Sequence, residues 1–178
     1  MSTLYLCGAG NSEGVRLALR IQEALSPWTQ IVLLDDDPAM WGRDRIGVPI
    51  VAGFDRLADA DPARDRVVNL VARATGGRAR ARQRIASYGV PFCTLIHPSV
   101  DCMGVAFADD VIVYPNVTLG PETRLGQGCV VFMGAVIGHE SVMGDGCVVA
   151  ANAVLNARVE LGEQTYVGTN ATILPEVR

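Results

Sequence analysis

The 178-residue sequence predicts an α/β sheet domain followed by a parallel β-helix. Two observations carry this prediction. Strand-like and helix-like segments alternate through the first half, and an unbroken six-residue repeat fills the last third. Apolar residues make up 49% of the chain, so two small domains can each bury a core. We place the α/β domain at residues 1–95 and the β-helix at residues 96–178.

The repeat runs from Val113 to Arg178 in eleven consecutive frames of six residues. Three such frames can close one triangular coil, with the first residue of each frame pointing inward and residues 18 apart stacked. Glycine often follows the first residue, and we expect it to relieve tight corners because it accepts unusual φ and ψ. Cys129 and Cys147 share the fifth position, so they should stack as small core residues and not as a disulfide. The first positions are all aliphatic or Met: Val113, Leu119, Leu125, Val131, Ile137, Met143, Val149, Leu155, Leu161, Val167 and Ile173.

The first half shows the alternation typical of a small parallel sheet. Strands are expected at residues 4–7, 30–34, 48–51, 66–71 and 92–96. Helices are expected at residues 15–25 and 78–88, the first because Leu17, Ala18, Ile21 and Leu25 recur at helical spacing. The second helix carries Arg78, Arg80, Arg82 and Arg84, which we interpret as a solvated face, with phosphate binding as the alternative.

A glycine-rich turn, Gly8-Ala9-Gly10-Asn11, follows the first strand and precedes a helix. Backbone N–H groups at such a turn favour a bound anion such as phosphate. The turn is a weak dinucleotide signature because Glu13 occupies the third glycine position of GxGxxG. A tight turn without a ligand is the alternative.

Two acidic residues, Asp35 and Asp36, end the second strand. Folds of this kind recognise a nucleoside at that place. The alternative is a turn and helix cap before Pro38.

Composition excludes several classes of protein. The net charge of −4 offers no basic field for nucleic acid. No segment resembles a signal peptide or reaches the ~20 apolar residues of a membrane span. The five cysteines are widely spaced without a CxxC pair, so we expect reduced thiols, a cytoplasmic protein and no metal site.

The order of four segments, GAGNSEG, LLDDD, TLIHPSV and GAVIGHE, resembles the bacterial sialic-acid O-acetyltransferase family over nearly the whole chain. That family includes acetyl-CoA-dependent N-acetyltransferases of nucleotide-linked 4-amino sugars, which serve cell-surface polysaccharide biosynthesis. The resemblance implies a Rossmann-like first domain, a left-handed β-helix, a homotrimer and acetyl-CoA in the groove between neighbouring helices. It implies nucleotide-sugar binding by Gly8, Ala9, Gly10, Asn11, Asp35 and Asp36, catalysis by His139 as general base with Glu140, and an acetyl-CoA contact at the Ala157 N–H.

The chemistry suits this assignment. A sugar amine that attacks a thioester must lose a proton, and a neutral imidazole can accept it. A carboxylate can fix the imidazole tautomer, and a backbone N–H can stabilise the tetrahedral oxyanion. His139 holds the third place of its frame, where a side chain should face outward. We therefore predict acetyl transfer to a sugar amino group, favoured over a hydroxyl group.

Four positions depart from the family pattern: Gly138 where an acid often precedes the base, Val148 where a second His is usual, Phe132 where an Asn is common, and Ser12 in place of a His. The sequence also ends about one coil early. The alternative is therefore a non-catalytic sugar-nucleotide-binding or assembly subunit with an incomplete acetyl-CoA groove.

Two other enzyme classes are disfavoured. A β-helix carbonic anhydrase would need three His ligands, and the chain has only His97 and His139. A nicotinamide-dependent oxidoreductase is disfavoured by the missing third glycine.

Overall fold

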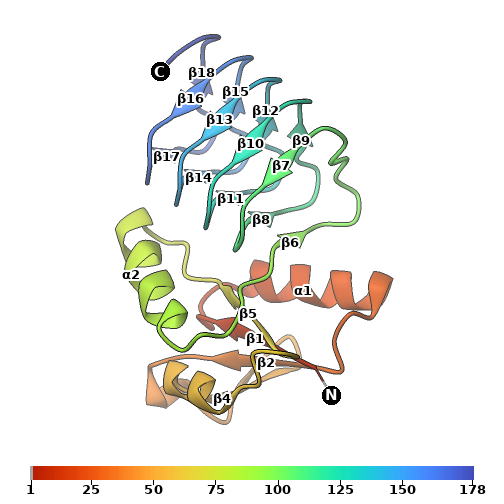
Figure 1. Ribbon diagram of the computed structural model, residues 1–178, viewed down its shortest axis with the longest axis vertical. Coiled ribbons are helices and arrows are strands. Elements are labelled where there is room, and N and C mark those ends of the chain that lie inside the picture. The colour runs from red at the N-terminus through yellow and green to blue at the C-terminus, as the bar shows by residue number, and fades with distance from the viewer. Residues whose placement is uncertain (1) are drawn as a thin grey trace.

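The computed structural model describes residues 2–178 and shows a β-helix standing on an α/β domain (Figure 1). In the α/β domain, β1 (Thr3–Cys7), β2 (Gln30–Leu34), β4 (Val48–Ala52) and β5 (Arg66–Asn69) run parallel, and β3 (Asp44–Arg45) joins the edge antiparallel. The sheet order is β3-β4-β2-β1-β5. No helix within residues 2–178 is long and apolar enough to cross a bilayer.

The two helices cover opposite faces of this sheet. Successive side chains of a strand point to opposite faces, so alternate residues of β1 contact different helices. Helix α1 (Ser12–Leu25) packs on Leu4 and Leu6, whereas Ile85 of α2 (Thr75–Ala86) packs with Tyr5 and Cys7. Two 3₁₀ turns, η1 (Pro38–Met40) and η2 (Phe54–Asp59), complete the domain. Helix α1 begins earlier than expected because the Asn11 side chain accepts the N–H of Gly14 and caps it.

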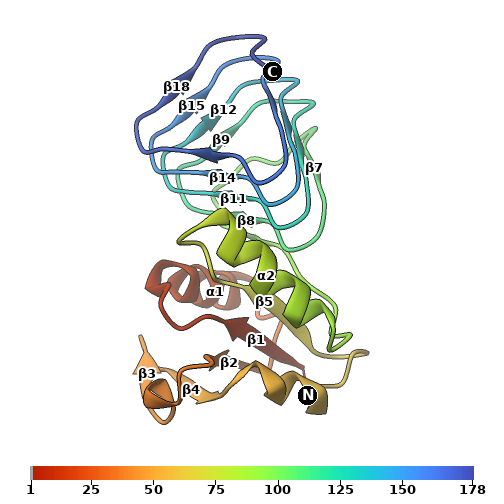
Figure 2. The same ribbon diagram turned by 90° about the vertical axis from the view of Figure 1, so that its left-hand side faces the viewer.

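Three parallel sheets form the sides of the β-helix, as the repeat predicts. Paired residues stand 18 apart, for example Arg124 with Val142 and Val130 with Val148. Figure 2 shows the coils stacked along one axis. The strands are β6 (Leu95–Ile96), β7 (Ala106–Phe107), β8 (Ile112–Val113), β9 (Thr118–Leu119), β10 (Arg124–Leu125), β11 (Val130–Val131), β12 (Val136–Ile137), β13 (Val142–Met143), β14 (Val148–Val149), β15 (Val154–Leu155), β16 (Glu160–Leu161), β17 (Tyr166–Val167) and β18 (Thr172–Ile173).

The first residue of each frame lies inside the coils, which confirms the inward positions. Val131, Ile137 and Met143 are at most 1% exposed and belong to one continuous core. Cys129 and Cys147 belong to the same core as free thiols, as expected. Each thiol donates to a carbonyl of the next coil, Gly144 at 3.2 Å and Gly162 at 3.0 Å.

The expected role of the glycines at the second position is wrong. None of them has a positive φ; the left-handed residue is the fourth of each frame, for example Glu140 (φ 59°) and Asn152 (φ 57°). Four of them, Gly120, Gly126, Gly138 and Gly144, are needed because the next coil passes too closely: a Cβ on Gly144 would lie 2.8 Å from the Glu163 nitrogen. The constraint is therefore steric and not conformational.

The expected strand at 92–96 is divided between the domains. Phe92 forms a single bridge to Val67 of the α/β sheet, whereas Leu95 and Ile96 form β6 and pair with β8 of the β-helix. The chain crosses between the domains within these few residues.

The α/β domain packs on the β6-β8-β11-β14-β17 sheet. Tyr114, Val130 and Val148, which are on this side of the β-helix, join the core beneath α1. The Tyr114 ring stacks on Phe132 with centroids 4.9 Å apart, and its hydroxyl accepts the Asn11 side-chain amide at 3.0 Å.

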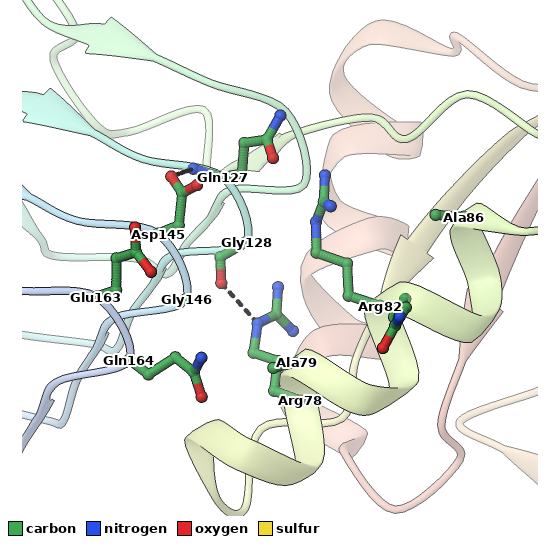
Figure 3. A pocket seen from close by; sticks show the side chains of 11 residues that line it. Arg78, Ala79, Arg82, Ala86, Gln127, Gly128, Asp145, Gly146, Glu163 and Gln164 are labelled. Carbon is green, nitrogen blue, oxygen red and sulfur yellow. Dashed lines mark hydrogen bonds between the residues drawn. The ribbon is translucent and has the colours of Figure 1, made fainter.

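A buried guanidinium ties α2 to the β-helix. Arg78 is 1% exposed, and its Nε donates to the Gly128 carbonyl at 2.6 Å (Figure 3). Its other nitrogens donate to the carbonyls of Asn69, Val71 and Asp110 and to the Asp110 carboxylate. Burial lowers the pKa of Arg78, and burial raises the pKa of Asp110 to about 6 against the attraction of Arg78. Desolvation of this pair is therefore offset mainly by the hydrogen bonds.

The solvated-face interpretation of the arginines of α2 is thus wrong for Arg78 and Arg82, which lie largely buried. Besides Arg78, Arg82 pairs with Asp109 at 2.8 Å, and Arg84 pairs with Asp36. Arg80 and Arg84 have the exposed positions expected for such a face, but Arg84 is paired with Asp36. Apart from Arg80, the arginines face the acidic end of the first coil or the end of β2.

Replacing Arg78 with Met should lower the free energy of unfolding by about 3–5 kcal/mol, because Asp110 and several carbonyls then stay buried without their donor. Arg80→Met on the same helix is the matched control and should change it by less than about 0.5 kcal/mol. Urea unfolding followed by circular dichroism measures both. Equal effects of the two substitutions would contradict the assigned role of Arg78.

Gly144→Ala should destabilise the β-helix by about 1–3 kcal/mol, because the new methyl group meets the backbone of the next coil. Gly162→Ala is the matched control, since it has the same frame position and a Cβ there meets nothing within 4 Å. Thermal unfolding of the two variants compares them. A loss no larger for Gly144→Ala than for Gly162→Ala would show that coil spacing is not the constraint.

Candidate active site

The glycine-rich turn lies at one wall of a cleft of about 540 Å³. The cleft opens at the carboxyl ends of β1, β2 and β5, where helix N-termini and loops meet in folds of this kind. Gly8 has a φ of 108°, and a Cβ there would lie 3.1 Å from the Val71 side chain. Glycine at this position thus lets β1 turn closely past the end of β5. The lining residues are Gly8, Gly10, Asn11, Asp35, Leu70, Val71, Ala72, Arg73 and Phe132.

Asp35 and Asp36 take different directions from the end of β2. Asp35 lines the cleft, and its carboxylate accepts the N–H of Ala9 at 2.8 Å and that of Asp37 at 3.0 Å. Asp36 is not among the lining residues. Its carboxylate accepts the N–H of Phe54 at 3.0 Å and pairs with Arg84. The cleft therefore holds one acid of the pair.

Ala9 is buried and serves to fix the turn. Its N–H donates to Asp35, and its carbonyl accepts the Nε of Arg45 at 3.0 Å. The turn is thereby held from both sides, leaving Gly10 and Asn11 at the cleft. Asn11 also accepts the N–H of Gly14 and donates to the Leu70 carbonyl at 3.2 Å, so it connects the turn, α1 and β5.

His139 and Glu140 lie at a corner of the β-helix, between β12 and β13. The Nδ1 atom of His139 is 2.8 Å from a carboxylate oxygen of Glu140, and both side chains are about half exposed. A carboxylate can only accept, so Nδ1 carries the proton and the neutral ring presents the lone pair of Nε2. Glu140 adopts the left-handed conformation of the fourth frame position, which turns its side chain back beside the ring.

Ala157 lies one coil beyond this pair. The chain passes directly above His139, because the N–H of Arg158 donates to the His139 carbonyl at 2.9 Å. The Ala157 N–H makes no hydrogen bond to any atom of residues 2–178. A Cβ on Gly138 would lie 2.6 Å from the Ala157 nitrogen, so glycine at 138 keeps this amide accessible. The corner thus combines an imidazole base and a free backbone donor.

The cleft and the His139 corner are far apart within one chain. The α/β domain packs on the β6-β8-β11-β14-β17 sheet, whereas the His139 corner joins the other two sheets. No cavity among the described residues contains both His139 and a residue of the glycine-rich turn. The structure therefore brings together His139, Glu140 and Ala157, and separately the turn with Asp35.

Two residues of the cleft, Arg73 and Phe132, did not appear among the expected binding residues. Arg73 follows β5, the third parallel strand that ends at the cleft. Because ligands bind at the carboxyl ends of such strands, its position in the sequence could have indicated it. Phe132 comes from the β-helix, and only the packing of the two domains brings it to the cleft. No group of three or more His, Cys, Asp or Glu side chains suited to a metal ion occurs within residues 2–178.

Comparisons with known proteins agree with this architecture. Residues 122–157 match the family described as bacterial transferase hexapeptide (six repeats). No curated protein sequence matches the chain.

Several solved structures share the fold. The acetyltransferase domain of PglB from Neisseria gonorrhoeae FA1090, in complex with acetyl coenzyme A, is 22% identical with a TM-score of 0.85, over 98% of this chain and 82% of that one. WeeI from Acinetobacter baumannii AYE is 17% identical with a TM-score of 0.84, over 98% and 81%. A mutant GDP-perosamine N-acetyl transferase from Caulobacter crescentus, in complex with CoA and GDP-perosamine, is 22% identical with a TM-score of 0.66, over 98% and 90%. At these identities the similarity establishes a common fold: an α/β domain that precedes a hexapeptide β-helix.

Proposed function

We propose that this protein transfers an acetyl group from acetyl-CoA to an amino group of a nucleotide-linked sugar. The observation that carries the proposal is the His139–Glu140 pair, whose hydrogen bond leaves Nε2 free as a base, with the Ala157 N–H on the next coil. Similar structures hold acetyl coenzyme A, or CoA with GDP-perosamine, and so support both substrate classes. A left-handed coil and a Rossmann-like first domain are part of the same proposal.

In this proposal His139 removes the proton that the amine must lose. The amine nitrogen bonds to the thioester carbonyl carbon, and its proton passes to Nε2 of His139. Collapse of the tetrahedral intermediate breaks the carbon–sulfur bond, and the proton on Nε2 can pass to the leaving thiolate. Glu140 stabilises the imidazolium through Nδ1 without taking the proton itself.

The Ala157 N–H is the donor for the oxyanion. Its hydrogen has no protein acceptor within residues 2–178, so no existing bond must break before it meets the developing charge. An alanine with its amide in a corner also places little bulk over the reacting carbon. Loss of one such donor in other acyl-transfer sites costs about 100-fold or more in kcat.

The cleft of the α/β domain is the proposed nucleotide-sugar site. The backbone at Gly10 and Asn11 leads into the N-terminus of α1, where a diphosphate is favoured. Arg73 adds a positive charge to the lining, and Asp35 offers a carboxylate for ribose or base donors. Asp36, which the sequence suggested as a second contact, is bound to Arg84 and has no place in the proposed contacts.

A second copy of the chain must complete the active site in this proposal. The cleft and His139 lie on different sides of one chain, so a sugar held in the cleft can meet only the His139 of a neighbour. The outer face of the β9-β12-β15-β18 sheet, which lies between these two sides, carries Thr118, Val136, Val154 and Thr172, without a charge. Such a face suits association, and we propose a homotrimer around it.

The second candidate function is a sugar-nucleotide-binding subunit without acetyl transfer. It is favoured by Val148, which is fully buried under the α/β domain at the position where the family that the sequence resembles usually has a second His. Calorimetry separates the candidates. Nucleotide-sugar binding without acetyl-CoA binding supports the second candidate and contradicts the first.

His139→Ala should lower kcat by at least about 100-fold, the usual effect of losing a general base. The affinity for the nucleotide sugar should stay within about twofold, because the cleft lies elsewhere. Steady-state acetyl transfer to a panel of nucleotide-linked amino sugars, with binding measured by calorimetry, tests both expectations. Unchanged turnover would remove His139 from the mechanism.

Mixed assemblies test whether neighbouring chains share the site. His139→Ala and Arg73→Glu, each inactive alone by this proposal, should recover about a quarter of wild-type activity when unfolded and refolded together in equal amounts, since one interface in four combines two intact parts. The same variants mixed without refolding are the control. No recovery in correctly refolded mixtures would place cleft and base in the same chain.

A further inference from the structure

A smaller cavity of about 200 Å³ lies between α1 and the beginning of the β-helix. Figure 1 shows α1 alongside β6, and the two elements are in contact. One wall is a face of α1 with Glu13, Arg16 and Arg20; the other carries His97 and Tyr114. The positions on α1 are three and four residues apart, so their side chains project together.

This cavity is separate from the cleft of the proposed sugar site. The hydrogen bond between Asn11 and the Tyr114 hydroxyl stands between them, because Asn11 lines the cleft and Tyr114 lines the cavity. The proposed acetyl transfer assigns no task to Arg16, Arg20 or His97. Ligand binding in this cavity is therefore independent of that function.

His97, which lines this cavity, has a hydrogen-bond donor on its ring. Its Nδ1 accepts the backbone N–H of Ser99 at 3.2 Å and lies 2.8 Å from the Ser99 hydroxyl. An amide N–H can only donate, so Nδ1 carries the lone pair and the proton of the neutral ring sits on Nε2. In His139 the proton is on Nδ1, so the two rings are opposite tautomers. The Nε2–H of His97 can donate to a ligand acceptor, whereas the bare Nε2 of His139 can remove a proton.

The two arginines keep donors available. Arg16 uses one nitrogen for Glu13 at 2.5 Å, and Arg20 uses one for Glu23 at 2.7 Å. A guanidinium has five N–H donors, so each retains several for a ligand. Burial, then the charges of Arg20 and Arg16, lower the pKa of His97.

We propose that this cavity binds a phosphate group, as a monoester or part of a diphosphate, between Arg16, Arg20 and His97. Two permanent positive charges and one negative charge, Glu13, line a space large enough for one phosphate. The lining itself is positive in a chain whose net charge is −4, although Glu13 and Glu23 each pair with one of its arginines. A dianion can be held by both guanidinium groups and by the imidazole N–H.

Nuclear magnetic resonance of the ring protons tests the proposal directly, because the chain has only two histidines. Sodium phosphate is added at constant ionic strength, and the pH titration of each ring is recorded. The His97 titration should move to higher pH by about one unit, which equals about tenfold tighter phosphate binding to the protonated ring than to the neutral ring. Phosphate affinity should accordingly rise as the pH falls, and the titration of His139 should not move.

Paired variants supply the control. Arg16→Gln with Arg20→Gln should weaken phosphate binding at least about tenfold. Arg56→Gln with Arg64→Gln removes two similar exposed arginines, paired with Asp59 and Asp61, and should leave binding within about twofold. A His97 titration that phosphate does not move, or equal binding by the two double variants, would overturn the proposal.

The source of the phosphate group is decided by comparing ligands. CoA, dephospho-CoA and UDP are each titrated against the same His97 signal. A response to CoA but not dephospho-CoA identifies a ribose phosphate monoester; a response to UDP identifies a nucleoside diphosphate; a response to phosphate alone identifies the free anion. Saturation at about 1–10 mM or below is expected for a site of two arginines and one imidazole.

Discussion

The close stacking of successive coils is the constraint on which the rest of the structure depends. Backbone hydrogen bonds join each strand to the strand one coil away, as in the pairing of Val130 with Val148. The coils approach so closely that a Cβ at Gly120 would lie 2.4 Å from the His139 nitrogen. This spacing leaves no freedom in register, since a shift of one residue would turn the buried aliphatic row outward. The stacking thereby fixes the position of every corner along the axis of the β-helix.

The position of the candidate catalytic corner follows from that stacking. The fourth position of each frame is left-handed, and at Glu140 this bends the carboxylate back to Nδ1 of His139. The same spacing places the Ala157 amide one coil beyond His139, without an acceptor among residues 2–178. A base, its orienting acid and a backbone donor thus come from two adjacent coils, and none of them depends on a flexible loop.

The α/β domain is held to the column by contacts of a different kind. The Arg78 guanidinium is buried among carbonyls of both domains, and the Tyr114 ring stacks on Phe132 beneath α1. These contacts set the cleft on one side of the column and leave the His139 corner on another. The same contacts therefore separate the two halves, and the proposed reaction, which uses both, would draw on more than one chain.

The sequence by itself determined the β-helix, because a six-residue period over eleven frames has few other ways to bury its aliphatic row. It also placed the glycine-rich turn at the end of β1 and the His139–Glu140 pair at an outward position. It misassigned Arg78 and Arg82 of α2, because Asp109 and Asp110 neutralise them, and such long-range pairing leaves no local pattern. The different directions of Asp35 and Asp36 were decided by contacts within the folded α/β domain, with Ala9, Phe54 and Arg84. The contribution of Phe132 to the cleft and the cavity at His97 were decided only when the two domains packed together, since each joins residues that are distant in the chain.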